Sequence, residues 1–413
     1  MSCRTDSTPL SPPSASPPPA APLPAALSWL DPALEHLEAE GLRRLPRVRR
    51  GRQGREVELN GQQLLNFGSN DYLGYSGDVR LTRACSKGSC AEGFGGGASP
   101  LVSGQSVAHQ TLERAIASLL SVDAALAFPS GYAANAATIP ALVGEGDLIA
   151  SDARNHASII DGCRLSKARL LVYPHRDLTA LEHALAAAGP AKRTLIVTDS
   201  LFSMDGTIAP LADLSEIAHR YAAMLMVDEA HATGVFGDRG SGLVEAAGCS
   251  DGVHIRVGTL SKAIGAAGGF VAGRASLTTW LSHAARAWVF STAHPPGVAA
   301  AAARGIALVG EEPFRRQQLL HKAAEFRAML ASRSVSTTSD SATERSGQIV
   351  PVVVGEPHRA VTISAALAEA GYFVPAIRPP SVPEGGSLLR ISLSWHHTEA
   401  DLTSLAEAIG AML

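Results

Sequence analysis

Residues 257–270 read VGTLSKAIGAAGGF, and Lys262 is the one charged residue among them. Glycine and alanine surround this lysine, and their small size lets backbone and a ligand come close to it. Lysine is also the side chain that forms Schiff bases with carbonyl compounds. Two interpretations are therefore open for this stretch: a solvated lysine beside a glycine-rich turn, or a lysine that binds a carbonyl cofactor.

A second stretch, residues 224–231, has the sequence MLMVDEAH and contains an acidic residue that could act together with Lys262. Its apolar run predicts a buried strand that ends at Asp228, and His231 follows three residues later. Ile255–Thr259 predicts another buried strand, which ends just before Lys262. The carboxyl ends of strands carry the functional groups of α/β sheets. An aspartate there can pair with the pyridinium nitrogen of pyridoxal phosphate (PLP), so the combination favours the cofactor interpretation.

The composition of the 413-residue chain limits its possible functions. With 46% hydrophobic residues the chain can bury a large core, and its length suggests two or three structural domains. The net charge of -3 offers no broad attraction for nucleic acids or anionic membranes. No apolar run reaches the ~18–20 residues that span a bilayer. The five scattered cysteines lack CxxC spacing, which favours a reducing, cytoplasmic compartment and argues against a metal site.

The N-terminal part of the chain divides into a tail and a short structured segment. Residues 1–28 are rich in Pro, Ser and Ala and predict a disordered tail. Residues 29–72 predict a helix over Trp29–Leu45 and a hairpin over Glu56–Phe67 that turns at Asn60-Gly61. Between these elements lies a basic cluster, which is either a solvated face or a clamp for carboxylate or phosphate. Its members are Arg43, Arg44, Arg47, Arg49, Arg50 and Arg52.

From residue 124 onward, apolar strand patterns alternate with helical ones, which predicts a mostly parallel sheet with helices on both faces. Unusual polar residues follow the strands, among them His156 and Ser203. The Ser-Gly turn at Gly131 enters a helix and suits a phosphate, although for this turn alone an ordinary helix cap is the favoured explanation. The predicted strands are 148–150, 169–173, 194–198, 225–227, 255–257 and 269–272, and a short apolar run at 124–128 precedes them.

We place the boundary between a large domain, residues 73–300, and a smaller α+β domain, residues 301–413, after the Pro295-Pro296 pair. The C-terminal domain is predicted to hold strands at 348–354, 372–377 and 388–393 and helices at 360–370 and 398–413. Arg378 and Arg390 are its arginines of interest. Arg390 lies within an apolar strand pattern, and a buried arginine needs an anionic partner. That partner is either a substrate carboxylate or a buried glutamate.

Together these motifs resemble the α-oxoamine synthases, which are PLP-dependent transferases of fold type I. The resemblance runs from about Leu42 to the C-terminus. It implies that the enzyme condenses a small amino acid with an acyl thioester of CoA and releases carbon dioxide. The matching motifs are SNDYLG (69–74), SGYAAN (130–135), NHAS (155–158), FSMDG (202–206), VDEAH (227–231) and TLSKA (259–263).

The resemblance also implies roles for individual residues. Lys262 would bind the cofactor covalently, Asp228 would pair with its pyridinium nitrogen, and His156 would stack on its ring. The ring hydroxyl would lie near His231 and Ser203. The remaining assignments are Gly131, Tyr132 and Thr259 near the phosphate, Thr292 near the phosphate of a neighbouring subunit, Asn70 and Arg390 at the amino-acid carboxylate, and Arg43 and Ser381 at the acyl substrate.

Within that family, residues 376–383 most resemble the biotin-pathway branch, whose members join L-alanine to a pimeloyl thioester of CoA or of a carrier protein. Ser381 replaces the usual Thr and keeps its hydroxyl, whereas Pro100 stands where many members carry Arg. Two other interpretations remain: a glycine C-acyltransferase that uses acetyl-CoA or succinyl-CoA, and an inactive scaffold that acts through protein partners. The resemblance implies a homodimer with its active site at the interface.

Overall fold

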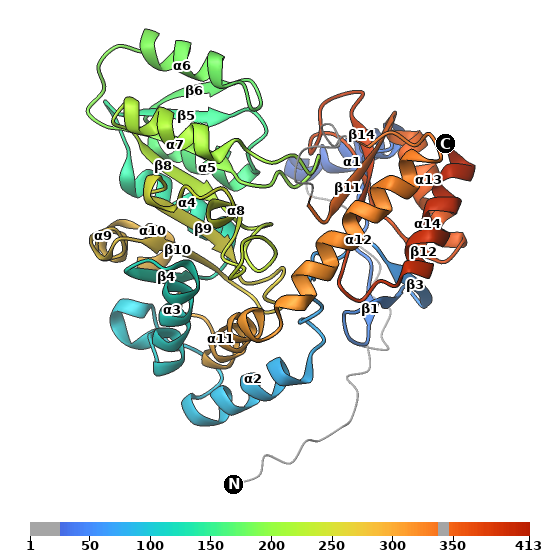
Figure 1. Cartoon of the computed structure of the whole chain (residues 1–413), viewed down its shortest axis with the longest axis horizontal. Helices are drawn as coiled ribbons and strands as arrows, with labels where there is room; N and C mark the ends of the chain where they lie inside the picture. The colour runs from blue at the N-terminus through green and yellow to red at the C-terminus, as the bar shows by residue number, and fades with distance from the viewer. Residues whose placement is uncertain (1–24, 338–346) are drawn as a thin grey trace.

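The computed structural model describes residues 25–337 and 347–413. Its centre is a seven-stranded sheet with the order β4-β10-β9-β8-β7-β5-β6 (Figure 1). β10 runs antiparallel to both of its neighbours, and the other strands run parallel to one another, as predicted. The strands are β4 (Ala124–Phe128), β5 (Leu148–Asp152), β6 (Arg169–Tyr173), β7 (Thr194–Asp199), β8 (Met224–Asp228), β9 (Ile255–Thr259) and β10 (Gly269–Gly273).

Both faces of this sheet are covered, and the side chains of each central strand alternate between two apolar clusters. In β7, Ile196 belongs to one cluster, whereas Leu195 and Val197 belong to the other. This alternation is the period of two that a strand buried on both faces requires. The surrounding helices are α2 (Val79–Glu92), α3 (Val107–Leu120), α4 (Gly131–Leu142), α5 (Ala157–Ser166), α6 (Leu178–Ala187), α7 (Leu211–Arg220), α8 (Leu243–Ala246), α9 (Ala275–Ala284), α10 (Arg286–Val289) and α11 (Pro296–Glu311).

Two smaller sheets lie outside the large one, and the first of them joins the N-terminal segment to the C-terminal part of the chain. One has the order β1-β2-β3-β12, with β1 (Arg49–Arg50), β2 (Glu56–Leu59), β3 (Gln62–Asn66) and β12 (Tyr372–Phe373). The other has the order β11-β14-β13, with β11 (Ile349–Gly355), β14 (Ser387–Ser392) and β13 (Ala376–Ile377). The helices of this part are α12 (Pro313–Ala331), α13 (Pro357–Glu369) and α14 (Glu399–Met412). The predicted hairpin at Asn60-Gly61 is thereby confirmed.

The prediction of one strand over residues 372–377 is wrong. β12 pairs parallel with β3, whereas β13 pairs antiparallel with β14, so the segment changes from one sheet to the other. Pro375 stands at this change. It has no backbone N–H to donate, and its carbonyl accepts a hydrogen bond from Arg390 N at 3.0 Å. The single strand predicted over 372–377 is therefore two short strands, each in a different sheet.

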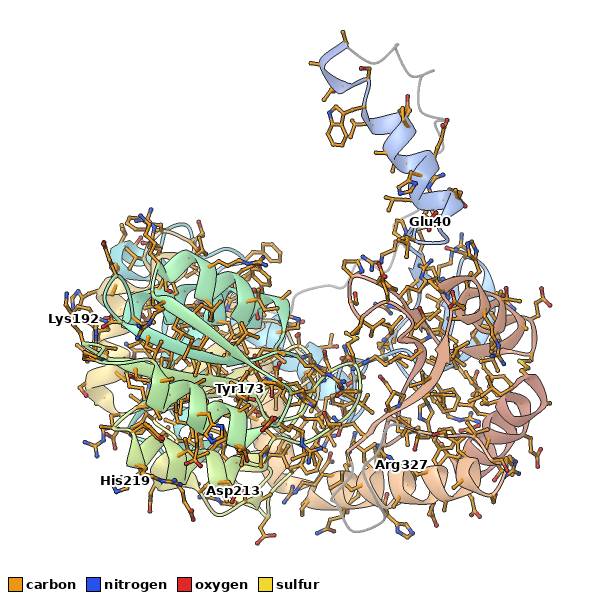
Figure 2. All side chains as sticks on the ribbon, turned by 90° about the horizontal axis from the view of Figure 1, so that it is seen from above. Glu40, Tyr173, Lys192, Asp213, His219 and Arg327 are labelled. Carbon is orange, nitrogen blue, oxygen red and sulfur yellow. The ribbon has the colours of Figure 1, made fainter. Side chains whose placement is uncertain are left out.

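The first helix is shorter than predicted. α1 spans Leu30–Ala39 rather than Trp29–Leu45, because Gly41 takes a left-handed conformation with φ +63° and Leu42 N then bonds to Leu37 O. α1 buries none of its residues, and it projects from the rest of the chain beyond Glu40 (Figure 2). The predicted tail lies outside the described residues except at its end, where Ala25–Leu27 form a 3-10 turn.

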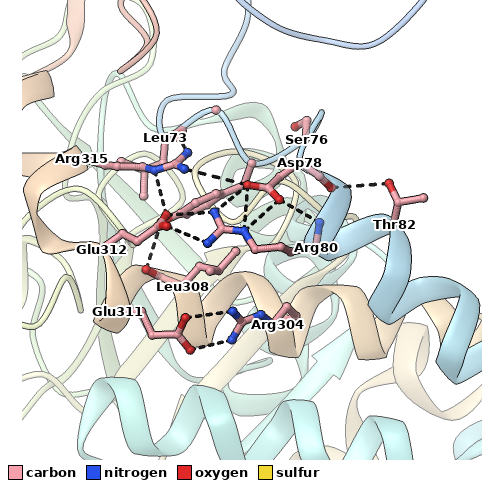
Figure 3. A network of polar contacts seen from close by, with 12 residues as sticks. Leu73, Ser76, Asp78, Arg80, Thr82, Arg304, Leu308, Glu311, Glu312 and Arg315 are labelled. Carbon is pink, nitrogen blue, oxygen red and sulfur yellow. Dashed lines mark hydrogen bonds and ion pairs between the residues drawn. The ribbon is translucent and has the colours of Figure 1, made fainter.

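The domain boundary predicted at residue 300 falls inside α11, which packs against α2 and α3 of the large domain. The chain leaves that domain at Glu312, between α11 and α12 (Figure 3). Glu312 accepts ion pairs from Arg80 at 2.7 Å and from Arg315 at 2.8 Å. Asp78 pairs with the same Arg80 at 2.7 Å. This network ties the start of α2 to the start of α12. Of the helices in the described ranges, none combines the length and the apolar character needed to cross a membrane.

Two glycines of α11 offer a test of this packing. A Cβ on Gly305 would lie 2.4 Å from Ile264 O, whereas a Cβ on Gly310 would meet nothing within 4 Å. We expect Gly305→Ala to destabilise the protein by about 1–3 kcal/mol, because the backbone near Lys262 would have to move. Gly310→Ala should be neutral or stabilising by about 0.5–1 kcal/mol, because alanine favours the helix. Urea unfolding of both variants measures the difference, and equal effects would contradict the close approach of α11 to Ile264.

Candidate active site

The side chains of Lys262 and His231 meet at the carboxyl edge of the large sheet. Lys262 follows β9, and His231 follows β8, the neighbouring parallel strand. The Lys262 Nζ atom lies 2.8 Å from His231 Nε2. Burial lowers the pKa of Lys262 to about 8, and the nearby Asp228 charge partly opposes this effect. Burial also holds the pKa of His231 well below its usual range, with the Lys262 charge as a further cause.

A chain of hydrogen bonds extends from His231 into the N-terminal loop and the small domain. His231 Nδ1 lies 2.6 Å from the hydroxyl of Tyr72, which donates to Asn70 Oδ1 at 3.1 Å. The same Asn70 oxygen accepts a bond from Arg390 Nη1 at 3.0 Å. Gln348 of the small domain donates to the His231 carbonyl at 2.8 Å. Three separate parts of the chain therefore meet around one imidazole.

Arg390 is buried in β14, and no Asp or Glu of the described residues forms an ion pair with it. The buried-glutamate explanation that the sequence left open is therefore not what the structure shows. Its Nε donates to Ser203 O, and its Nη1 donates to Ser392 Oγ at 2.8 Å. Within the described ranges, Nη2 makes no hydrogen bond, so one arm of the guanidinium remains for an anionic ligand.

The Asp228 carboxylate is held by a neighbouring amide and by its own backbone. Oδ2 accepts a hydrogen bond from Asn135 Nδ2 at 2.6 Å, and Oδ1 accepts one from Ala230 N at 2.8 Å. Asn135 also donates to Ser158 Oγ, which lies 2.7 Å from His156 Nδ1. The residues predicted for the pyridinium nitrogen and for ring stacking are thus linked through α4 and α5.

A second carboxyl group, that of Asp199, lies beside Asp228 in the register of β7 and β8. Asp199 Oδ2 accepts a hydrogen bond from His156 N at 2.7 Å. Burial raises the pKa of Asp199 well above its usual range, and repulsion from Asp228 adds to this effect. Asp199 therefore holds the His156 backbone, and its environment disfavours a second charged carboxylate beside Asp228.

The start of α4 forms a cradle with free backbone donors. Ser130 caps the helix by accepting a bond from Ala133 N at 3.0 Å, which leaves the N–H groups of Gly131 and Tyr132 without a capping partner. A Cβ on Gly269 would lie 2.4 Å from Gly131 N, so only glycine lets β10 come this close. Thr259 faces the same spot, 3.4 Å from the place of a Cβ on Gly131. Such a helix start suits a phosphate.

The structure places the other predicted site residues farther out. Ser203 and Ser381 line one pocket between the large and small domains, together with Arg154, Phe202, Val353 and Leu388. Arg43 is exposed, pairs with Glu38 at 3.0 Å and borders a second pocket beside Pro379. Tyr132 is exposed and donates to Asp161. Thr292 is exposed in a third pocket, which also holds Pro100, His109 and Glu113.

Sequence reasoning missed the roles of Tyr72, Asn135 and Asp199. Tyr72 and Asn135 stand in the motifs SNDYLG and SGYAAN, which the sequence analysis singled out. The motifs did not reveal which residues these two side chains would bond to. Asp199 directly follows the strand predicted over 194–198, just as Asp228 follows the apolar run 225–227, and this similar position was the available signal. None of the three contacts follows from spacing along the chain.

Comparison with known proteins assigns this geometry to a family. Residues 62–409 match the model of the class I and II aminotransferases. Because this match spans most of the sequence, the chain belongs to the class I and II aminotransferase family. It is also 48% identical over 387 residues to the 8-amino-7-oxononanoate synthase of Anaeromyxobacter sp. strain Fw109-5, which covers 94% of this chain and 96% of that relative.

Solved structures confirm the predicted PLP fold of type I and the likeness to α-oxoamine synthases. A serine palmitoyltransferase variant from S. paucimobilis, solved with bound PLP, superposes with a TM-score of 0.88 at 28% identity and covers 94% of this chain and 97% of its own. The 8-amino-7-oxononanoate synthase of Francisella tularensis superposes with a TM-score of 0.72 at 27% identity and covers 84% and 97%.

The residues of this chain fit PLP on their own chemistry. A primary amine with a lowered pKa can bind the aldehyde. The Asp228 carboxylate can hold a proton on the pyridine nitrogen, and the cradle at Gly131 offers donors to the phosphate. The buried Asn135 Oδ1 has no hydrogen-bond partner in the described part of the chain, which indicates room for a further donor beside Asp228.

The lowered pKa of Lys262 predicts how the apoprotein takes up PLP. The amine reacts when neutral, so the rate of uptake should rise about tenfold per pH unit up to about pH 8 and level off above it. Stopped-flow absorbance, followed by borohydride reduction and peptide mapping to Lys262, measures this rate. Lys262→Ala serves as the control and should show no mapped adduct. A rate that still rises near pH ~10, as for an exposed lysine, would contradict the effect of burial.

Proposed function

We propose that this protein catalyses the decarboxylative condensation of L-alanine with a pimeloyl thioester to give 8-amino-7-oxononanoate, carbon dioxide and the free thiol carrier. The observation that carries the proposal is the meeting of Lys262, His231 and Asp228 at one sheet edge with Arg390 facing them. A relative that is 48% identical over nearly the whole chain carries the name of this activity. The carrier is CoA or an acyl carrier protein.

Bound PLP supplies an electron sink, which stabilises negative charge on the α-carbon of the amino acid. Asp228 supports this chemistry by keeping a proton on the pyridine nitrogen. Asn135 and Ala230 N hold the Asp228 carboxylate in place with bonds of 2.6 and 2.8 Å. His156, anchored by Asp199 and Ser158, is positioned to cover the ring.

Lys262 moves the proton in this proposal. With a pKa of about 8, its amine exists in both protonation states near neutral pH, so it can take the α-proton of alanine and return it later. His231 lies 2.8 Å away and is neutral, so its Nε2 accepts a hydrogen bond from the amine. Tyr72 fixes the imidazole from the other side at 2.6 Å. Gly131, Tyr132 and Thr259 bind the phosphate.

Arg390 and Asn70 bind the alanine carboxylate in this proposal. The bond between Asn70 Oδ1 and Arg390 Nη1 keeps the guanidinium in one orientation, and Nη2 remains for the substrate. The acyl chain would occupy the pocket lined by Phe202, Val353 and Leu388, with Ser381 and Arg43 toward its outer end. Apolar walls of this kind suit a methylene chain.

We further propose a homodimer in which Thr292 reaches the phosphate site of the partner subunit. Its exposure at the surface of one chain supports this placement. We propose a cytoplasmic location, which the five scattered cysteines without CxxC spacing support.

The choice of amino acid and acyl donor tests the activity directly. We expect CoA release with alanine and pimeloyl-CoA to exceed the release with glycine and acetyl-CoA or succinyl-CoA by about tenfold or more in kcat/KM, because one methyl group is worth about 1–3 kcal/mol in a fitted pocket. A thiol assay with each pair measures this. If a glycine pair is best, the protein is a glycine C-acyltransferase. Absence of turnover and of any absorbance change with amino acids would support an inactive scaffold.

Arg390→Lys tests the carboxylate site. Lysine keeps the charge but loses the planar fork, so the KM for alanine should rise about ten- to a hundredfold, with less effect on the KM for the acyl donor. Arg378→Lys provides a matched control in the same small domain, because Arg378 donates to Gly41 O and Arg43 O instead. An unchanged KM for alanine in Arg390→Lys would remove Arg390 from the carboxylate site.

A further inference from the structure

The segment from Gly41 to Arg55 concentrates positive charge in a chain whose net charge is -3. It contains seven arginines and neither aspartate nor glutamate. Three of these arginines pair with acidic groups: Arg43 with Glu38, Arg50 with Glu58, and Arg55 with Glu56 and Asp401. Among the described residues, no ion pair includes Arg44, Arg47, Arg49 or Arg52. Arg44 and Arg49 donate to neutral oxygens and Arg47 lies over the Phe373 ring, so their positive charges remain for a polyanionic ligand.

One of these unpaired arginines borders a pocket that leads to the candidate active site. Arg49 lines an open pocket together with Gln53, Ser69, Asn70 and Ser261. Ser261 directly precedes Lys262. Asn70 bonds to Arg390 at 3.0 Å. The pocket thus extends from Arg49 at the surface to residues that neighbour Lys262 and Arg390, the two groups proposed to act on alanine.

The rim of this pocket offers further donors and little negative charge. Ser76 lines it, and Arg52 lies beside the next residue, since its Cβ is 3.6 Å from the place of a Cβ on Gly77. Asp71 also borders the pocket, but its Oδ1 accepts hydrogen bonds from Tyr75 N and Ser76 N. Burial raises the pKa of Asp71, which shows that its environment disfavours the charged form. An anion at the rim therefore meets arginine and hydroxyl groups.

We propose that Arg49 and Arg52 bind the phosphate of the phosphopantetheine arm that carries the acyl group, and that the arm enters along the open pocket that Arg49 and Asn70 line. This inference rests on the proposed function for the presence of a thioester donor. Its chemistry is that of arginine with a phosphate ester. CoA and an acyl carrier protein both bear such a phosphate next to pantetheine, and the experiment separates them.

The first test measures binding without turnover. Calorimetry of the PLP-loaded protein with CoA and with pantetheine, which lacks phosphate, should show tighter binding of CoA. Arg49→Gln should weaken CoA binding about three- to tenfold and leave pantetheine binding unchanged, and Arg49→Gln/Arg52→Gln should weaken CoA binding further. Arg49→Lys keeps the charge and should restore part of the affinity. Arg164→Gln, which removes an exposed arginine from α5, is the control and should change neither CoA binding nor pantetheine binding.

The second test uses the acyl donors. In Arg49→Gln the KM should rise about three- to tenfold for pimeloyl-CoA, with kcat and the KM for alanine unchanged. A matching rise with pimeloyl carrier protein supports the phosphate that both donors share, whereas a rise with CoA alone would place the contact at the nucleotide phosphates of CoA and overturn the assignment to the phosphopantetheine phosphate. Equal losses for CoA and pantetheine, or no loss for either, would overturn the proposal. The binding test keeps its meaning even if alanine and pimeloyl-CoA prove to be the wrong substrates.

Discussion

An amine and an imidazole that lie 2.8 Å apart cannot both carry a positive charge without strong repulsion, and the site at Lys262 and His231 depends on this constraint. The structure meets it by burial, which lowers the pKa of both groups. Asp228 then supplies a negative charge that acts on the same amine. Burial and repulsion from Asp228 raise the pKa of Asp199, so the environment disfavours a second charged carboxylate at this place. The balance of charge thus follows from where four titratable groups are buried.

This balance requires parts of the chain that are far apart in sequence. Tyr72 approaches His231 from the N-terminal loop, and Arg390 and Gln348 approach from the small domain. The ionic network at Glu312 holds the start of that small domain against α2 (Figure 3). Tyr75 of the same N-terminal loop donates to Glu312 at 3.2 Å. The contacts that orient His231 and the contacts that join the two domains therefore share one loop.

Sequence patterns predicted the parallel sheet because its strands are nearly continuous apolar runs with polar residues at their carboxyl ends. They also placed Lys262, His231 and Asp228 near one another, since β8 and β9 are neighbours. The patterns failed for residues 372–377, because these residues pair with strands of two different sheets. They also failed for the end of α1, because the left-handed conformation of Gly41 is not visible in the apolar period of the segment. The bonds of Tyr72 and Asn135 were out of reach because they join loops whose separation depends on the whole fold.

The glycines around Lys262 were expected to let backbone and a ligand come close, and the structure shows how closely the backbone approaches. A Cβ on Gly265 would lie 2.6 Å from the backbone of Tyr75 and Ser76, so the lysine segment lies directly on the loop that carries Asn70 and Tyr72. Gly269 similarly admits the start of α4, where the phosphate cradle forms. Larger side chains at either position would force the lysine segment away from these two neighbours. The two glycines thus let the backbone of the lysine segment contact the backbone of its two neighbours. These contacts help to set the distances between the Lys262 amine, the His231 imidazole and the phosphate donors at the start of α4.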